Sequence, residues 1–313
     1  MESAADSPAL VSTATHEGAV DPTPGAVLPG DGPGLAGARP FREVLRDYVA
    51  LTKPRIIALL LVTTVTTMFV ADPSGLSLAT ILWTMLGGYL AAGGAGAINH
   101  YLDRDRDARM ARTCARPLVA GRIEPLHGLA FGLSLGTLAI VELALAVNLL
   151  AAALALSGLL GYVLVYTLWL KPLTPQNIVI GGAAGAVPPL VGWAAATGEL
   201  SVEALFGFAV VFLWTPPHFW ALALLVKDDY ERTGIPMLPV ARGDAATHRQ
   251  ILAYAIALVA FTVVPYLTGF LGGAYLAAAL WRRPSRRAAL RLYLASLAYL
   301  ALLFAAMALD RVL

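Results

Sequence analysis

Residues 149–169 read LLAAALALSGLLGYVLVYTLW, a continuous apolar run without a charged side chain. A helix of roughly 20 apolar residues is long enough to cross the hydrocarbon core of a bilayer. The run does not alternate between apolar and polar residues, as a strand of a membrane barrel would. Because lipid offers the backbone no hydrogen-bond partner, the run predicts a transmembrane helix.

The same kind of run recurs along the chain. We expect nine helical spans, at about residues 53–71, 79–101, 126–146, 149–169, 177–197, 204–226, 250–267, 268–281 and 290–309. The seventh and eighth form one uncharged stretch from Ile251 to Trp281, which Pro265 and three glycines interrupt, so eight spans is the alternative. The predicted fold class is therefore all-α, a polytopic transmembrane helical bundle.

The composition agrees with a membrane protein. Hydrophobic residues make up 58% of the chain and charged residues 13%, against about 25% charged residues in an average soluble domain. The net charge is only +2, and the single cysteine, Cys114, excludes an intrachain disulfide. We expect the lipid bilayer as the surrounding medium and no nucleic-acid partner.

Residues 1–38 differ from the rest. They are rich in Pro, Gly, Ala, Ser and Thr, and their charged residues are all acidic. This composition is typical of a disordered segment, and it is typical neither of a secretory signal nor of a mitochondrial transit peptide. We predict a disordered tail at 1–38 and one transmembrane domain at 39–313.

Lysine and arginine are distributed asymmetrically over the predicted loops. With nine spans, the N-terminus and the loops after spans 2, 4, 6 and 8 share one side and carry the basic residues, whereas only Arg311 lies on the other side. The positive-inside rule then predicts a cytoplasmic N-terminus in a multi-pass protein of the cell membrane. The polar clusters described next lie on this cytoplasmic side.

The first cluster is at the end of the second predicted span. Asn99, Asp103 and Asp107 are four residues apart, so a helix places their side chains in one stripe about 12 Å long. Two neighbouring carboxylates favour a bound cation, and Mg²⁺ is held by one or two carboxylates together with substrate phosphates. Arg112 and Arg116 follow and suit bidentate binding of diphosphate oxygens. The alternative is a solvated helix end of mixed charge.

The second cluster, Lys227-Asp228-Asp229-Tyr230, ends the sixth predicted span on the same side of the membrane. Two acidic clusters that face each other would hold two metal ions on one diphosphate. Within the sixth span, Pro216-Pro217 precedes His218, the one histidine well inside a span. An ionisable residue at this depth indicates a functional site.

Small residues accompany these clusters. Gly87-Gly88, Gly93-Gly94 and Gly96 lie in the second span. We expect them to allow close helix approach rather than to line a tunnel for a lipid tail.

Three stretches carry a resemblance to a known family. Asn99-x-x-x-Asp103-x-x-x-Asp107 resembles the first aspartate-rich motif of the intramembrane prenyltransferase superfamily. The stretches 99–121, 166–192 and 212–240, with Thr-Pro-Gln-Asn, Pro-Pro-His-Phe-Trp and Pro-Met-Leu-Pro, resemble the protohaem IX farnesyltransferase family more narrowly. The second Asp-x-x-x-Asp motif of quinone-precursor prenyltransferases is missing, because Arg232 and Thr233 follow Asp228 and Asp229 by four residues.

The resemblance implies an enzyme that transfers farnesyl from farnesyl diphosphate to a vinyl group of haem b, making haem O, with Mg²⁺ as cofactor. It implies catalytic or metal-binding roles for Asn99, Asp103 and Asp107, with Asp228 or Asp229. It implies substrate contacts for a second set: Lys53, Arg116, Tyr166, Lys171, His218 and Lys227. For His218, ligation of haem iron, action as a base and a hydrogen bond between helices stay open. A downstream haem-modifying or oxidase-assembly protein is the expected partner.

Two other functions remain as alternatives. One is prenyl transfer to a quinone precursor or another aromatic lipid, against which the missing second Asp-x-x-x-Asp motif argues. The other is a transporter or assembly factor, which would place ionisable residues near the bilayer midplane. Here those residues gather at one membrane face, as a diphosphate site requires.

Overall fold

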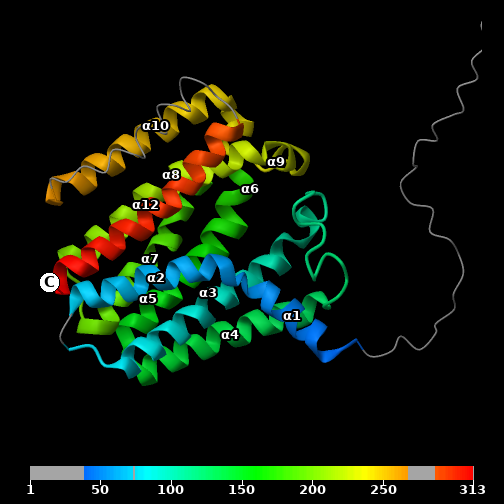
Figure 1. Cartoon of the computed structure of the whole chain (residues 1–313). Helices are drawn as coiled ribbons and strands as arrows, with labels where there is room; N and C mark the ends of the chain where they lie inside the picture. Colours follow the sequence, from blue (N-terminus) through cyan, green and yellow to red (C-terminus); the bar gives the residue numbers. More distant parts are fainter. Residues whose placement is uncertain (1–38, 73–74, 267–285, 313) are drawn as a thin grey trace, which may run out of the picture. The chain divides into compact units, whose positions relative to one another are not determined.

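The computed structural model describes residues 39–72, 75–266 and 286–312. The chain separates into two units, Met1–Arg39 and Pro40–Leu313, and only the second is described below. The predicted tail and the predicted span at 268–281 lie outside the described residues. Every regular element among the described residues is helical, so the all-α prediction is confirmed. The elements are α1 (Phe41–Thr52), α2 (Pro54–Ala71), α3 (Leu78–Asp107), α4 (Pro125–Ala146), α5 (Leu149–Leu160), the π-helix η1 (Gly161–Leu170), α6 (Lys171–Leu173), α7 (Asn177–Thr197), α8 (Val202–Leu225), α9 (Lys227–Thr233), α10 (Leu238–Tyr266) and α12 (Arg286–Val312) (Figure 1).

Seven stretches of helix in the described residues are long and apolar enough to span a membrane. They lie at Pro54–Ala71, Leu78–Asp107, Pro125–Ala146, Leu149–Leu173, Asn177–Thr197, Val202–Leu225 and Arg286–Met307. These match the first six predicted spans and the ninth. The predicted span at 250–267 falls on α10, which bends at Gly243 and is not among the seven. The chain is a multi-pass membrane protein, and the total of nine spans stays a prediction.

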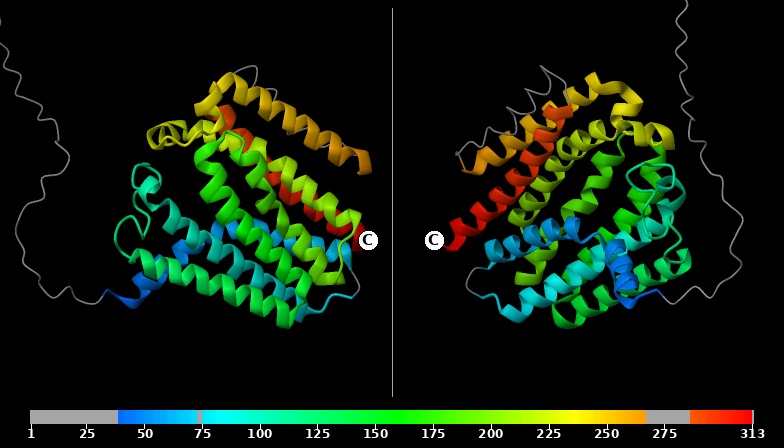
Figure 2. Two further views of the ribbon diagram at one scale, coloured as in Figure 1. Left: turned by 180° about the vertical axis from the view of Figure 1, so that it is seen from behind. Right: turned by 45° about the vertical axis from the view of Figure 1, so that its right-hand side comes forward.

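Glycine contacts bring neighbouring helices together, as the sequence predicts. A Cβ atom on Gly94 of α3 would lie 2.7 Å from the carbonyl oxygen of Gly132 and 2.8 Å from the backbone nitrogen of Gly136, both on α4. Figures 1 and 2 show α3 and α4 side by side along most of their length. Such backbone contact is possible only because glycine has no side chain, and it holds α3 close against α4.

The bundle closes because its last helix returns to its first span. α12 packs on both α8 and α2, and α7 packs on both α2 and α8. Large apolar side chains remain exposed on the outside, for example Leu145 at 84%. In water such a surface would drive association, whereas a bilayer solvates it.

Candidate active site

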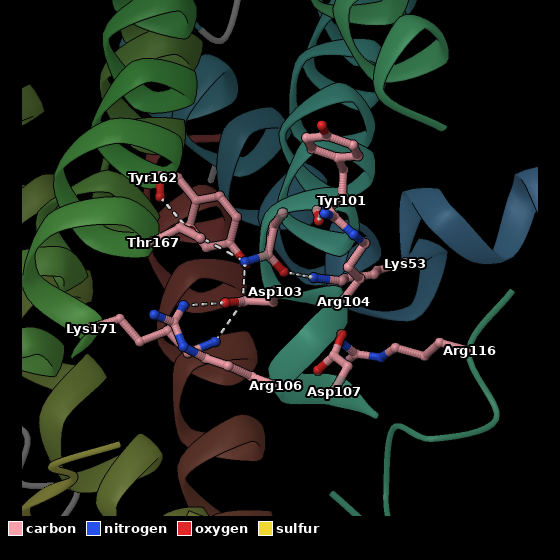
Figure 3. A network of polar contacts seen from close by, with 11 residues as sticks. Lys53, Tyr101, Asp103, Arg104, Arg106, Asp107, Arg116, Tyr162, Thr167 and Lys171 are labelled. Atoms are coloured by element: carbon pink, nitrogen blue, oxygen red, sulfur yellow. Dashed lines mark hydrogen bonds and ion pairs between the residues drawn. The ribbon is translucent and has the colours of Figure 1, made fainter. Parts of the chain in front are cut away.

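The polar cluster lies at the C-terminal end of α3, where the helix continues without a break to Asp107. Asn99, Asp103 and Asp107 are buried, at 4%, 1% and 4% exposure. Figure 3 shows the aspartates on one side of α3, turned toward basic side chains from other elements. The helical period therefore makes the stripe that the sequence predicts.

Asn99 ties three elements together. The Nζ of Lys53 donates to its Oδ1 at 2.7 Å. Its Nδ2 donates to Asp103 Oδ2 at 2.8 Å and to Thr167 Oγ1 at 3.2 Å. Because the amide both accepts from a cation and donates to a carboxylate, it holds the two charges in a fixed order along the stripe.

Each aspartate of the stripe is neutralised by cations. Lys171 Nζ lies 2.5 Å from Asp103 Oδ2, and Arg106 Nη1 lies 3.2 Å from Asp103 Oδ1. Arg116 Nη1 lies 2.5 Å from Asp107 Oδ2. Buried carboxylates need such partners, and these cations can also bind an anionic ligand.

Lys53 occupies an unusual backbone position. It joins α1 to α2 with φ 59° and ψ 55°, and it is the one non-glycine residue with positive φ among those described. This left-handed conformation costs a side-chain-bearing residue about 1–2 kcal/mol. Burial, together with the charges of Arg116 and Lys171, lowers the pKa of Lys53 to about 7. Strain and unfavourable charge at one residue are typical of a functional site.

The π-helix η1 forms the side of the polar cluster that faces α3. In η1 the hydroxyl of Thr167 donates to the carbonyl oxygen of Tyr162, five residues earlier, at 2.8 Å. The wider turn places Thr167 against Asn99, and Lys171 follows directly after it. π-Helical turns inside α-helices are frequent at functional sites.

The second acidic cluster has a different arrangement. Asp229 is buried and accepts from the backbone N–H groups of Ala111 (3.1 Å) and Arg112 (3.4 Å), and it pairs with Arg232. Burial opposes ionisation of Asp229, but the hydrogen bonds from Arg232 and from the two amides hold the pKa of its carboxyl below the usual value. Asp229 thus anchors the loop that carries Arg112 and Arg116.

The other residues of this cluster point elsewhere. Asp228 is exposed. Lys227 Nζ donates to Asp244 Oδ1 at 3.0 Å, which raises the pKa of Lys227, and it lies 3.8 Å from Glu231 Oε1. The described structure thus brings Lys53, Arg116 and Lys171 to the α3 stripe, and Lys227 to α10.

His218 belongs to the contact between α8 and α12. Its Nδ1 lies 2.7 Å from the hydroxyl of Ser296, and its ring stacks between Trp214 and Tyr293, with centroids 4.1 Å and 4.6 Å away. Of the three roles left open, the interhelical hydrogen bond is present. Tyr166 is buried and stacks on Tyr162 at 5.5 Å.

An apolar cavity of about 250 Å³ begins at the polar cluster. Lys53 and Tyr162 line one end, and the rest of the wall is apolar except for Thr52 and Thr64, with residues from α2, α3, α5 and α7. Gly88 and Gly96 of α3 are part of this wall. The expectation that the glycines of α3 serve helix packing is confirmed at Gly94, but the expectation that they line no tunnel is wrong for Gly88 and Gly96.

The donor atoms suit Mg²⁺ shared with a phosphate ligand. Within residues 39–72, 75–266 and 286–312, no group of three or more His, Cys, Asp or Glu side chains could hold a metal ion. Asn99, Asp103 and Asp107 offer one amide and two carboxylates, all of them oxygen donors. Mg²⁺ prefers such oxygens and completes its octahedron with water and substrate phosphates rather than with a full protein cage.

Sequence reasoning left three contributors unnamed, namely Arg106, Tyr162 and Thr167. Arg106 sits three residues after Asp103, a spacing that predicts contact on a helix. Tyr162 and Thr167 gave no such signal, because a π-helix inside an apolar run cannot be read from periodicity.

Comparison with known proteins identifies relatives. A model of the UbiA prenyltransferase family matches residues 60–282. The chain is 53% identical over 284 residues to a protein named protoheme IX farnesyltransferase from Roseiflexus sp. (strain RS-1), covering 86% of this chain and 53% of that protein. A protein of the same name from Symbiobacterium thermophilum is 53% identical over 283 residues, covering 86% of this chain and 95% of that protein. The chain thus spans about half the length of the first relative and nearly all of the second.

The fold is similar to that of a solved protein as well. The structure of a UbiA homolog from Archaeoglobus fulgidus bound to GPP and Mg²⁺ superposes with a TM-score of 0.66 at 17% sequence identity. The match covers 85% of this chain and 99% of that chain. At this identity the likeness concerns the fold.

Proposed function

The chain belongs to the UbiA prenyltransferase family, and we propose that it transfers a farnesyl group from farnesyl diphosphate to a vinyl group of protohaem IX (haem b), making haem O and releasing diphosphate. The names of the relatives at about half identity support both donor and acceptor. The resemblance of the Pro-Pro-His-Phe-Trp and Pro-Met-Leu-Pro stretches to the protohaem IX farnesyltransferase family supports the same assignment.

One observation carries the proposal. A buried cluster of cations and carboxylates opens into an apolar cavity through Lys53 and Tyr162. A ligand that fits has an anionic head and an apolar tail, and a prenyl diphosphate has both. A transporter has no need of a cavity with one charged end at a single membrane face.

The stripe and the cations around it have different roles at the diphosphate. Lys53, Arg116 and Lys171 donate to its oxygens in charge-assisted hydrogen bonds. Arg116 and Lys171 exchange their carboxylate partners Asp107 and Asp103 for the substrate, and Lys53 exchanges the amide oxygen of Asn99. Asn99, Asp103 and Asp107 would hold Mg²⁺, which when bound supplies positive charge for the departing diphosphate. Asp229 keeps the loop of Arg116 in place. The sequence suggested Lys227 as a diphosphate contact and Asp228 as a ligand of a second metal ion. Because Lys227 donates to Asp244 and Asp228 is exposed, we propose no role for either at the diphosphate.

The reaction breaks the allylic C1–O bond, and its electron pair leaves with the diphosphate. The vinyl π electrons of haem b form the new bond to C1, water adds to the resulting cation on the haem side, and one proton is lost to solvent. The preorganised cations stabilise the charge that develops on the leaving group. The apolar wall excludes bulk water, which would quench the farnesyl cation. Tyr166 and His218 are the proposed contacts of the acceptor.

Position in the cell follows from the same proposal. The basic face and the N-terminus face the cytoplasm, and the membrane is the cell membrane, so that the diphosphate reaches the site from the cytoplasmic side. A downstream haem-modifying or oxidase-assembly protein would receive haem O.

A turnover assay on the purified chain tests the proposal. Haem b, farnesyl diphosphate and Mg²⁺ are supplied, and the pigments are separated by mass. We expect a product heavier than haem b by one hydroxyfarnesyl unit. Unchanged haem in the presence of folded protein would remove the acceptor assignment, and aromatic acceptors would then be screened with the same donor.

A further inference from the structure

The order of the lining residues along α2 and α3 gives the direction in which the apolar cavity runs. The lining residues run from Lys53, which directly precedes α2, to Thr64 of α2, and on α3 from Gly96 to Gly88, away from the polar cluster in both cases. Eleven residues of helix correspond to roughly 16 Å and eight residues to roughly 12 Å. The cavity is therefore a channel that runs from the cluster toward the opposite membrane face.

A contact between α2 and α7 lies at its far end. Gly192 of α7 packs so tightly on Thr64 of α2 that a Cβ atom at 192 would collide with the Thr64 carbonyl oxygen. Thr64, which makes this contact, and Val191, which precedes Gly192 in sequence, are the last lining residues on α2 and α7. Beyond them Met68 and Ala194 are fully buried in packed apolar core. Backbone contact of this kind does not yield, because no side chain is present to change rotamer.

Nearer the polar cluster, the wall of the channel leaves unoccupied space. Gly185 of α7 lines the cavity, and a Cβ atom placed there would meet nothing within 4 Å. The channel is thus open near its mouth and closed where Gly192 meets Thr64, so its usable length is set at one level.

We infer that the contact of Gly192 with Thr64, together with the side chain of Val191, forms the floor of the prenyl channel and limits the donor to three isoprene units; this inference rests on the proposed prenyl diphosphate donor. With carbon–carbon bonds of about 1.5 Å, the twelve-carbon main chain of farnesyl extends roughly 14 Å. The sixteen-carbon main chain of geranylgeranyl extends roughly 19 Å on the same geometry. The first fits the channel and the second exceeds it.

The test measures binding without haem, so that its result is independent of the acceptor. Geranyl, farnesyl and geranylgeranyl diphosphates are titrated with Mg²⁺ into the full-length chain in nanodiscs. The wild type should bind farnesyl diphosphate about tenfold more tightly than geranyl diphosphate, with no further gain for the longest chain. Val191→Phe raises the floor, so farnesyl diphosphate should bind about tenfold more weakly while geranyl diphosphate stays within about threefold.

Two further variants complete the design. Val191→Ala lowers the floor and should improve geranylgeranyl diphosphate binding by about threefold or more relative to farnesyl diphosphate. Val210→Phe is the matched control, since Val210 is fully buried in α8 and does not line the channel. It carries the same overpacking and should leave the ratio between the three donors unchanged.

The outcomes separate the two proposals. If the chain-length preference is the same in wild type and in both Val191 variants, the inference of a floor is overturned, since the tail then leaves the channel sideways into lipid. Length selection as described, with haem returned unmodified in the turnover assay, supports the floor and removes the acceptor. Absence of binding by all three donors to folded wild-type protein overturns both.

Discussion

Replacing Asp103 by Asn tests the polar cluster most directly. Asp103 is 1% exposed and accepts from Asn99, Arg106 and Lys171 at 2.8, 3.2 and 2.5 Å. The amide introduced by Asp103→Asn would keep the shape but lose the charge. Its NH₂ group would face either the donors of Asn99 and Lys171 or the donor of Arg106, depending on its orientation. Removing one member of a buried ion pair costs about 3–5 kcal/mol. Arg106 is 31% exposed and regains water, so we expect the lower limit, about 3 kcal/mol.

The effect on catalysis should exceed the effect on folding. If Asp103 orders the charges that meet the diphosphate, Asp103→Asn lowers kcat by about 10²–10³-fold, the size of one preorganised electrostatic contact. The assay is haem O formation at a temperature well below the unfolding midpoint, with thermal unfolding measured in parallel. A folded Asp103→Asn protein with wild-type turnover would refute the reasoning.

Asp105→Asn is the matched control for the same change on the same helix. The Asp105 side chain is 83% exposed and lies 3.7 Å from Arg104, and a surface pair of this kind contributes at most about 1 kcal/mol. Turnover should stay within about twofold of wild type. An equal loss in both variants would mean that net negative charge at the helix end matters, and not the position of Asp103.

Other expectations follow from the same contacts. Lys171→Met should weaken farnesyl diphosphate binding by about tenfold or more, because a charge-assisted hydrogen bond is lost. In the wild type the ammonium of Lys227 contacts Asp244 and Glu231, so Lys227→Met should change farnesyl diphosphate binding by less than about threefold. Equal effects of the two variants on binding would contradict the geometry. The folded-state pKa of Asp229 lies below its unfolded value, so its contribution to stability is present above the unfolded pKa and is lost as the pH falls through the folded pKa. Asp229→Asn should therefore be less stable than wild type at neutral pH and converge with it in acid, as thermal unfolding against pH would reveal; a constant gap down to the lowest pH would oppose this. Chelation of Mg²⁺ should abolish turnover and restoration of Mg²⁺ should recover it, whereas turnover that persists with excess chelator would exclude the proposed metal.

Periodicity along the chain was enough to predict several features correctly. The apolar runs predict the seven membrane-spanning stretches that the structure describes, because hydrocarbon accepts only hydrogen-bonded helices. The spacing of Asn99, Asp103 and Asp107 predicts a common face, because it matches the helical repeat. Both features depend on residues close together in sequence.

The partners of that face could not be read in the same way. Lys53 meets Asn99 across 46 residues of sequence, Lys171 meets Asp103 across 68, and Asp229 meets Ala111 across 118. Which helices become neighbours depends on how their surfaces pack, including the glycine contacts that set their approach. Side-chain direction at helix ends depends on the same packing, and so Asp229 holds a loop while Lys227 reaches α10. The channel is likewise a space left between four packed helices, and no single stretch of the chain contains the information that makes it.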